Sequence, residues 1–94
     1  MKFKKGDLVK VLRIYSYDNE DSVEKKRLSE IYVNRAGEIG EIDKYSELRY
    51  YCYYIRFNEN EISHFYAREM RLLTEREQFL YHILGSDAFR KEEL

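Results

Sequence analysis

Few residues of this chain could do chemistry, and none of them forms a catalytic pattern. Cys52 is the only cysteine, and His64 and His82 are the only imidazoles among 94 residues. A nucleophile needs a base beside it, and neither histidine lies next to a nucleophile or carboxylate motif. Carboxylates are so frequent that no pair of them is informative. We therefore expect no enzyme and no catalytic residue, with Cys52 as a buried, inert side chain in a central strand.

The same scarcity argues against a metal or a cofactor. One Cys and two His do not make a zinc-ligand set at the usual spacings. The segment 37–42 (GEIGEI) contains two glycines, but it lacks the Lys-Ser/Thr ending and the following helix of a phosphate loop. The sequence predicts no metal ligands and no bound cofactor.

Charge and hydropathy indicate a soluble protein. Its 17 basic residues nearly balance 18 acidic ones, which gives a formal net charge of −1, and this balance is not typical of a polyanion-binding protein. Charged residues follow Met1 at once, and no apolar run approaches the roughly 18 residues that span a bilayer. With a single cysteine and no secretory leader, we expect a cytoplasmic protein without a membrane segment.

A surplus of tyrosine favours a protein partner. Ten residues are Tyr, more than a thin core needs, and Tyr and Arg are favoured at interface hot spots. The candidate partner-binding residues are Tyr15, Tyr17, Arg49, Tyr50, Tyr54 and Arg56. The alternative is that Tyr50 and Tyr54 pack beneath an apolar stripe of the C-terminal helix, which would remove much of this surface.

Nucleic-acid binding is the alternative function. The N-terminus is locally basic, with only Asp7 opposing, and exposed tyrosines could stack on bases. The candidate residues for this function are Lys2, Lys4, Lys5, Lys10 and Arg13. Against it, six acids face three bases between residues 38 and 61, and basic residues also protect strand edges from pairing.

Alternating apolar residues predict five strands. Their expected ranges are Leu8–Tyr15, 37–42, Tyr50–Phe57, Glu61–Tyr66 and Met70–Leu73. Gly37 suits a turn, whereas Gly40 inside a strand indicates a bulge or bend. The strongest strand is Tyr50–Phe57, which we expect to be central, with one face in the core and the other face partly covered.

Two further segments interrupt or follow the strands. Ser16–Arg35 is interpreted as a long charged loop, with helical spacing for a single turn at Leu28, Ile31 and Tyr32. Such a loop is either functional or simply a solvated loop that these three residues hold in place. Thr74 and Glu77 form a capping box, after which Phe79, Leu80, Ile83 and Leu84 form one apolar stripe that ends at Gly85.

This order of elements resembles the SH3-like barrel, including its KOW-type variants, over about residues 3–73. The resemblance is carried by KGDLVKV (5–11), GEIGEI (37–42), YYIRF (53–57) and EMRLL (69–73), and the chain is also similar to short phage or prophage proteins of the YorP-like kind. It implies a mainly β fold: a five-stranded SH3-like barrel over residues 1–73, with a long charged loop at 16–35. A capping helix over residues 74–94 would pack on this barrel.

The resemblance and the residues together predict a non-catalytic interaction or regulatory module with a protein partner. The phage resemblance implies a small accessory protein that modulates a host factor. The chain lacks Trp and the Ala-Leu-Tyr-Asp-Tyr signature of signalling SH3 domains, which argues against recognition of proline-rich peptides. The KOW resemblance implies RNA or ribosome contact, the alternative function. The oligomeric state is left open between monomer and homodimer.

Overall fold

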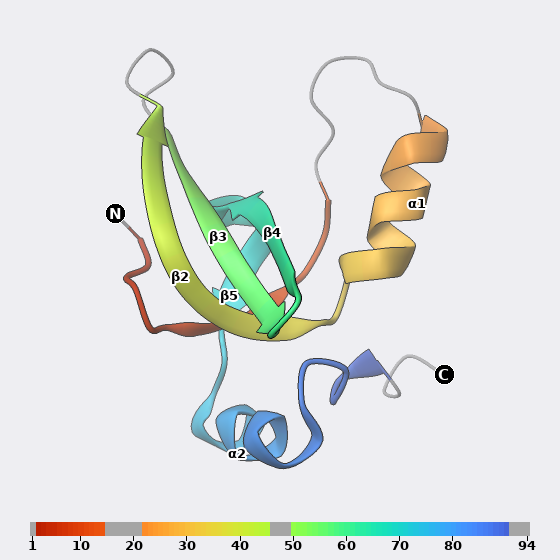
Figure 1. Cartoon of the computed structure of the whole chain (residues 1–94). Helices are drawn as coiled ribbons and strands as arrows, with labels where there is room; N and C mark the ends of the chain where they lie inside the picture. The colour runs from red at the N-terminus through yellow and green to blue at the C-terminus, as the bar shows by residue number, and fades with distance from the viewer. Residues whose placement is uncertain (1, 15–21, 46–49, 91–94) are drawn as a thin grey trace.

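The computed structural model describes residues 2–14, 22–45 and 50–90, and the described part is mainly β, as predicted (Figure 1). Its elements in chain order are β1 (Leu8–Val11), α1 (Ser22–Tyr32), β2 (Ala36–Tyr45), β3 (Tyr50–Asn58), β4 (Glu61–Tyr66), the 3-10 helix η1 (Ala67–Glu69), β5 (Met70–Leu72) and α2 (Glu75–Leu84). All five predicted strands are present, although β1 ends at Val11 rather than at Tyr15.

The five strands form one antiparallel sheet in the order β4-β3-β2-β1-β5. β3 lies between β2 and β4, so its predicted central position is confirmed. β4 and β5 stand at the two ends of the order and do not pair within the described part of the chain, so a closed barrel is not confirmed. β2 curves strongly along its length and wraps around one side of the core (Figure 1).

The two glycines of β2 have different roles. Pairing with β3 shifts register between Ile39 and Glu41, so the bulge predicted at Gly40 is confirmed. Gly37 does not form the predicted turn but lies inside β2, opposite Val9 of β1. A Cβ at Gly37 would lie 2.5 Å from the carbonyl oxygen of Arg56, so the close approach of β2 to β3 requires glycine there.

The main core lies on the inner face of the curved sheet. The odd-numbered residues of β3 form its core face, because Tyr53, Ile55 and Phe57 are buried and Tyr51 is half-buried. The Tyr53 hydroxyl accepts hydrogen bonds from the backbone N–H groups of Lys2 (3.1 Å) and Phe3 (3.4 Å). A buried Tyr therefore satisfies its polar tip by holding the N-terminal segment against the core.

The interpretation of Ser16–Arg35 as a long loop is wrong for its second half, which forms the 11-residue helix α1; residues 16–21 lie outside the described residues. Leu28, Tyr32 and Val33 pack against the core, and the Tyr32 ring lies 5.6 Å from that of Phe57. Asn34 follows in the left-handed region (φ 68°), where it ends the helix. Tertiary packing stabilises α1 although its sequence pattern is weak.

Helix α2 begins and ends as predicted, but three of the four residues of its predicted apolar stripe are exposed. The Thr74 hydroxyl accepts from the Glu77 N–H and the Glu77 carboxylate accepts from the Thr74 N–H, so the capping box is confirmed. Gly85 ends the helix with φ 84°.

Only Leu80 of the four residues in the predicted stripe packs inward. Leu80 packs with Tyr81 against a second core cluster of Ala36, Leu73 and Phe89. Phe79, Ile83 and Leu84 are instead 65%, 60% and 62% exposed; we call these three residues the α2 stripe. The chain turns back after Gly85, and Phe89, 1% exposed, packs with Ala36 and Leu73.

Arg35 joins three segments of the chain. Its guanidinium donates two hydrogen bonds of 2.7 Å to the two carboxylate oxygens of Glu61 in β4, and its Nε lies 3.1 Å from Asp87 Oδ1, beyond α2. It also lies over the Phe57 ring, 4.7 Å from the centroid. The hydrogen bond to Glu61 raises the pKa of Arg35 and lowers that of Glu61, although burial opposes both shifts.

Arg90 connects the end of the segment after α2, residues 85–90, with α1. It donates hydrogen bonds to the carbonyl oxygens of Glu30 and Ile31 in the last turn of α1. A cation at a helix C-terminus is favourable because it meets unpaired carbonyls and the negative end of the helix dipole. Residues 85–90 therefore connect α2 with both the sheet and α1.

We predict that Gly37→Ala lowers the free energy of unfolding by about 1–3 kcal/mol, because the new methyl group overlaps backbone that cannot easily move. Gly40→Ala is the matched control in the same strand: its Cβ would meet nothing closer than 4.0 Å, so its stability should stay near that of the wild type. Urea denaturation of the wild type and both variants measures their free energies of unfolding. Equal denaturation midpoints for the two variants would contradict this prediction.

We predict that Glu77→Gln lowers the free energy of unfolding by about 1–2 kcal/mol at pH 7. Hydrogen bonds from Arg71, together with the Thr74 N–H, lower the pKa of Glu77 from 4.5 to about 2 against the opposing effect of burial. A lowered carboxyl pKa stabilises the fold fully above about pH 4.5, and this contribution disappears as the pH falls to about 2.

The measurement is denaturant unfolding of wild type and Glu77→Gln from pH 7 down to pH 3. The difference in free energy of unfolding between the two proteins should be constant at neutral pH and should decrease steadily below about pH 4.5. If this difference keeps its full size at pH 3, the charge of Glu77 does not stabilise the start of α2.

Candidate functional site

An open hollow of about 440 Å³ lies on the outer face of β2 and β3, and we call it the β2–β3 groove. Its apolar side chains are Tyr54 and Ile62, and its charged side chains are Lys5, Glu38, Glu41, Asp43 and Arg56. Ile39 also borders it, but its side chain is buried in the main core. Gly40, at the bulge, also lines it and contributes no side chain. The groove thus combines an apolar floor with charges of both signs, a composition typical of protein-binding surfaces.

The bulge at Gly40 assembles the acidic side of the groove. In a regular strand Glu38 and Glu41 would point to opposite faces, because side chains alternate with a period of two. The extra residue of the bulge changes this phase, so both glutamates line the groove together with Asp43. Register places Arg56 opposite Glu38 and Tyr54 opposite Glu41.

The N-terminal segment supplies the remaining charge of the groove. Gly6 turns the chain with φ 93°, and its N–H donates to the Ile39 carbonyl at 2.8 Å. The Ile39 N–H in turn donates to the Asp7 carbonyl at 2.9 Å. These two backbone hydrogen bonds hold the segment against β2 and bring Lys5 to the groove.

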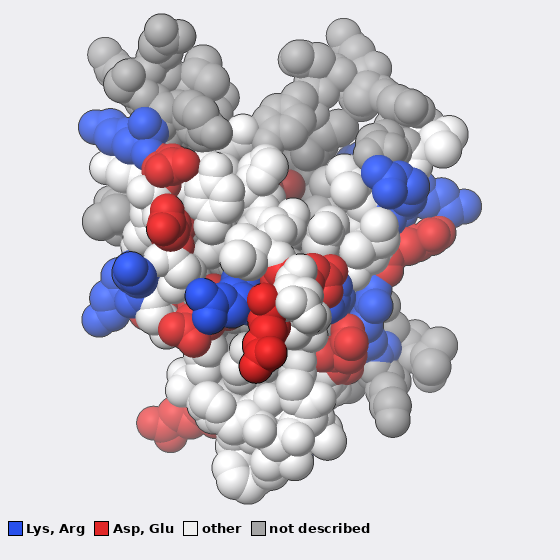
Figure 2. All heavy atoms as spheres, viewed as in Figure 1, with Lys and Arg blue, Asp and Glu red and all other residues white. Residues whose placement is uncertain are grey.

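Acids and bases alternate across this face. Three carboxylates and two basic side chains line the groove, and Figure 2 shows red and blue atoms interleaved around an uncharged middle. Burial raises the pKa of Tyr81, and the charge of Glu38 raises it further.

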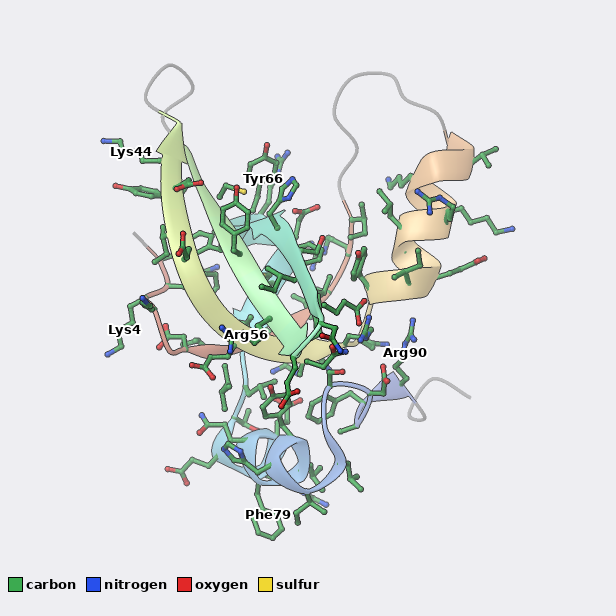
Figure 3. All side chains as sticks on the ribbon, in the orientation of Figure 1. Lys4, Lys44, Arg56, Tyr66, Phe79 and Arg90 are labelled. Atoms are coloured by element: carbon green, nitrogen blue, oxygen red, sulfur yellow. The ribbon has the colours of Figure 1, made fainter. Side chains whose placement is uncertain are left out.

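Two of the six candidate partner-binding residues meet in the groove. Tyr54 is half-buried, with its ring 5.8 Å from that of His64, and Arg56 is exposed on the same face of β3 (Figure 3). Tyr54 does not pack beneath the apolar stripe of the C-terminal helix, because the α2 stripe is exposed. Tyr50 begins β3, but its side chain lies outside the described residues, as do Tyr15, Tyr17 and Arg49 entirely.

One of the five residues of the predicted basic surface is not accessible. Lys2, Lys4, Lys5 and Arg13 are exposed, but Lys10 is 9% exposed. The Lys10 ammonium lies 3.7 Å from Glu77 Oε2 and 5.2 Å from the centroid of the Phe89 ring. The assignment of Lys10 to an accessible basic surface is therefore wrong, because it is engaged between the sheet and the C-terminal segment.

The residues that could do chemistry do not meet in the groove. Cys52 is 1% exposed in β3, as predicted, and burial raises the pKa of its thiol, with smaller contributions from the charges of Asp43 and Glu69. His64 and His82 are exposed on β4 and α2. Among the described residues that line the groove, none is Cys or His, and the described part of the chain holds no cluster of three metal-ligating side chains.

Sequence reasoning missed the acidic side of the groove and Ile62. Glu38, Glu41 and Asp43 counted only as charge that opposes nucleic acid, because alternation alone separates Glu38 from the other two. The one signal for their convergence was Gly40, whose bulge was predicted without its effect on side-chain direction.

Comparisons with protein-family models, curated proteins and solved structures find no match to this chain. Neither α1 nor α2, nor any other helix within residues 2–14, 22–45 and 50–90, is long and apolar enough to cross a membrane. The functional interpretation rests on the groove and on the exposed surfaces around it.

We predict that Cys52 reacts with a thiol reagent at least about a hundredfold more slowly in the native protein than in urea. The reason is that its thiol is buried and its pKa is raised, so little thiolate is available to react. The rate of modification at pH 8 measures this, with a short cysteine peptide as the control for reagent strength. A native rate close to that of the peptide would mean that β3 opens readily.

Proposed function

We propose that this chain is a non-catalytic protein-binding module and that the β2–β3 groove receives an extended segment of a protein partner. The observation that carries the proposal is that Tyr54 and Arg56 lie together in a hollow of about 440 Å³ with charges of both signs. Tyr and Arg are the residue types most often found at the energetic centre of protein interfaces.

The fold supports a finer assignment to the SH3-like barrels. β2, β3 and β4 form a meander, the one-turn helix η1 separates β4 from β5, and β5 returns to pair with β1. This succession is the one that the sequence resemblance implies. Function does not follow from a fold by itself, so the groove, and not the fold, carries the proposal.

The charges of the groove favour a protein segment over nucleic acid. A phosphate backbone laid along the groove would meet three carboxylates and only two basic side chains, and Lys10 is buried away from it. A peptide can match both signs: a basic side chain would face Glu41 and Asp43, and an acidic one would face Arg56. An apolar side chain would pack between Tyr54 and Ile62.

The test is a pull-down from bacterial lysate, with and without nuclease, using the wild type and Tyr54→Ser/Arg56→Ser. We expect the wild type to recover a specific protein in the presence of nuclease, and the variant to recover roughly thirtyfold less, as loss of a hot spot does. Circular dichroism checks that the variant is folded.

The matched control is Phe79→Ser/Arg76→Ser, which removes an exposed aromatic ring and an exposed arginine from α2 instead. Its recovery of the partner should equal that of the wild type. Recovery that disappears on nuclease treatment would move the function to nucleic acid, and equal losses in both variants would remove the groove from the proposal.

A further inference from the structure

The β2–β3 groove is built from successive cross-strand pairs on the outer face of the sheet. The first, second and third pairs, which we call rows, are Glu38 with Arg56, Glu41 with Tyr54, and Asp43 with Cys52. Successive rows are two residues apart on β3, which is about 7 Å along the strand. Because Cys52 is buried, the third row presents only a carboxylate to the groove.

The first row is the basic end of the groove. Arg56 belongs to this row, and Lys5 also lines the groove. The Gly6 N–H donates to the Ile39 carbonyl at 2.8 Å, which holds Lys5 close to this end of β2. Since Glu38 is the one carboxylate of the first row, this end has a net positive charge.

The second and third rows form the acidic end of the groove. Glu41 and Asp43 are exposed, and neither row contains a basic residue. Lys44 follows Asp43 in sequence, but its ammonium lies 5.9 Å from the centroid of the Tyr51 ring, which belongs to the core face of β3. Figure 3 shows Lys44 and Arg56 far apart along the sheet. The charges of the groove are therefore separated by sign along the strands.

The fold does not use these charges. Within residues 2–14, 22–45 and 50–90, no ion pair engages a charged side chain of the groove. Even Glu38 and Arg56, which register places opposite each other, form none. Charges of both signs are thus available to a ligand at defined positions, and complementary charge mainly determines which ligand is selected.

We propose that the groove selects an extended peptide with an acidic, an apolar and a basic side chain at positions i, i+2 and i+4; this inference rests on the proposed function of the groove. Alternate side chains of an extended chain point the same way and are about 7 Å apart, which matches the rows. The acidic side chain lies between Arg56 and Lys5, the apolar one packs on Tyr54, and the basic one reaches Asp43.

The test is an amide NMR titration of the protein with capped synthetic peptides. SDSLSKS carries the proposed pattern, and SDSLKSS has the same composition, but its odd spacing turns the lysine to the other side of an extended chain. SDSLSDS and SKSLSKS carry like charges instead. We expect SDSLSKS to bind with a dissociation constant on the order of 0.1–1 mM, and the other three to bind about fivefold more weakly.

Charge reversal in the protein tests the position of each sign. Arg56→Glu should weaken binding of SDSLSKS about fivefold and strengthen binding of SKSLSKS by a similar factor. Asp43→Lys should likewise favour SDSLSDS. Both side chains are exposed, so both variants should fold, which circular dichroism checks. Arg76→Glu is the matched control: it changes the net charge equally from an exposed position on α2, and it should leave every affinity unchanged.

Several outcomes would overturn the proposal. These are no binding of SDSLSKS at a concentration of about 5 mM, equal affinities for SDSLSKS and SDSLKSS, shifts centred outside the groove, or charge reversals that do not exchange the preferred peptide. The proposed function would survive these outcomes if the pull-down still recovers a partner that Tyr54→Ser/Arg56→Ser loses, because that experiment assumes no peptide pattern. The two failures are therefore distinguishable.

Discussion

The ion pair between Arg35 and Glu61 is the interaction on which the arrangement of the chain depends most. Arg35 is 7% exposed and lies between α1 and β2, so its charge must be matched where it is buried. Glu61 of β4 provides the match, and Asp87 extends it to the segment after α2. Because removing one partner would leave an unpaired buried charge, the positions of β4, α1 and the C-terminal segment are coupled.

The curvature of β2 links this framework to the groove. Gly37 lets β2 approach the backbone of β3 closely, and the bulge at Gly40 follows three residues later. Gly37 allows close packing of the two strands near Arg35, whereas the bulge at Gly40 changes which side chains reach the outer face. The groove is thus a consequence of strand geometry, and its Tyr54 and Arg56 come from β3, which lies between β2 and β4.

Helix α2 divides its side chains between two tasks. Leu80 and Tyr81 close the second core cluster with Phe89, while Lys10 and Arg71 hold the start of the helix through Glu77. The opposite side is apolar without contributing to that packing. The mixed-charge groove and the exposed apolar residues of α2 are two distinct surfaces of the described part of the chain.

Local sequence determined the strands, the bulge, the capping box and the stop at Gly85, because alternation, capping and glycine conformation depend on neighbouring residues. Only the tertiary structure decided that α1 is a helix, that the odd-numbered face of β3 is the core face, that Lys10 is buried and that Phe89, not Phe79, packs with Ala36 and Leu73. It also brought Glu38, Glu41 and Asp43 to one face. The physical reason is that burial and ion pairing depend on segments far apart in the chain, and a periodic pattern does not indicate which of two apolar surfaces the core will accept.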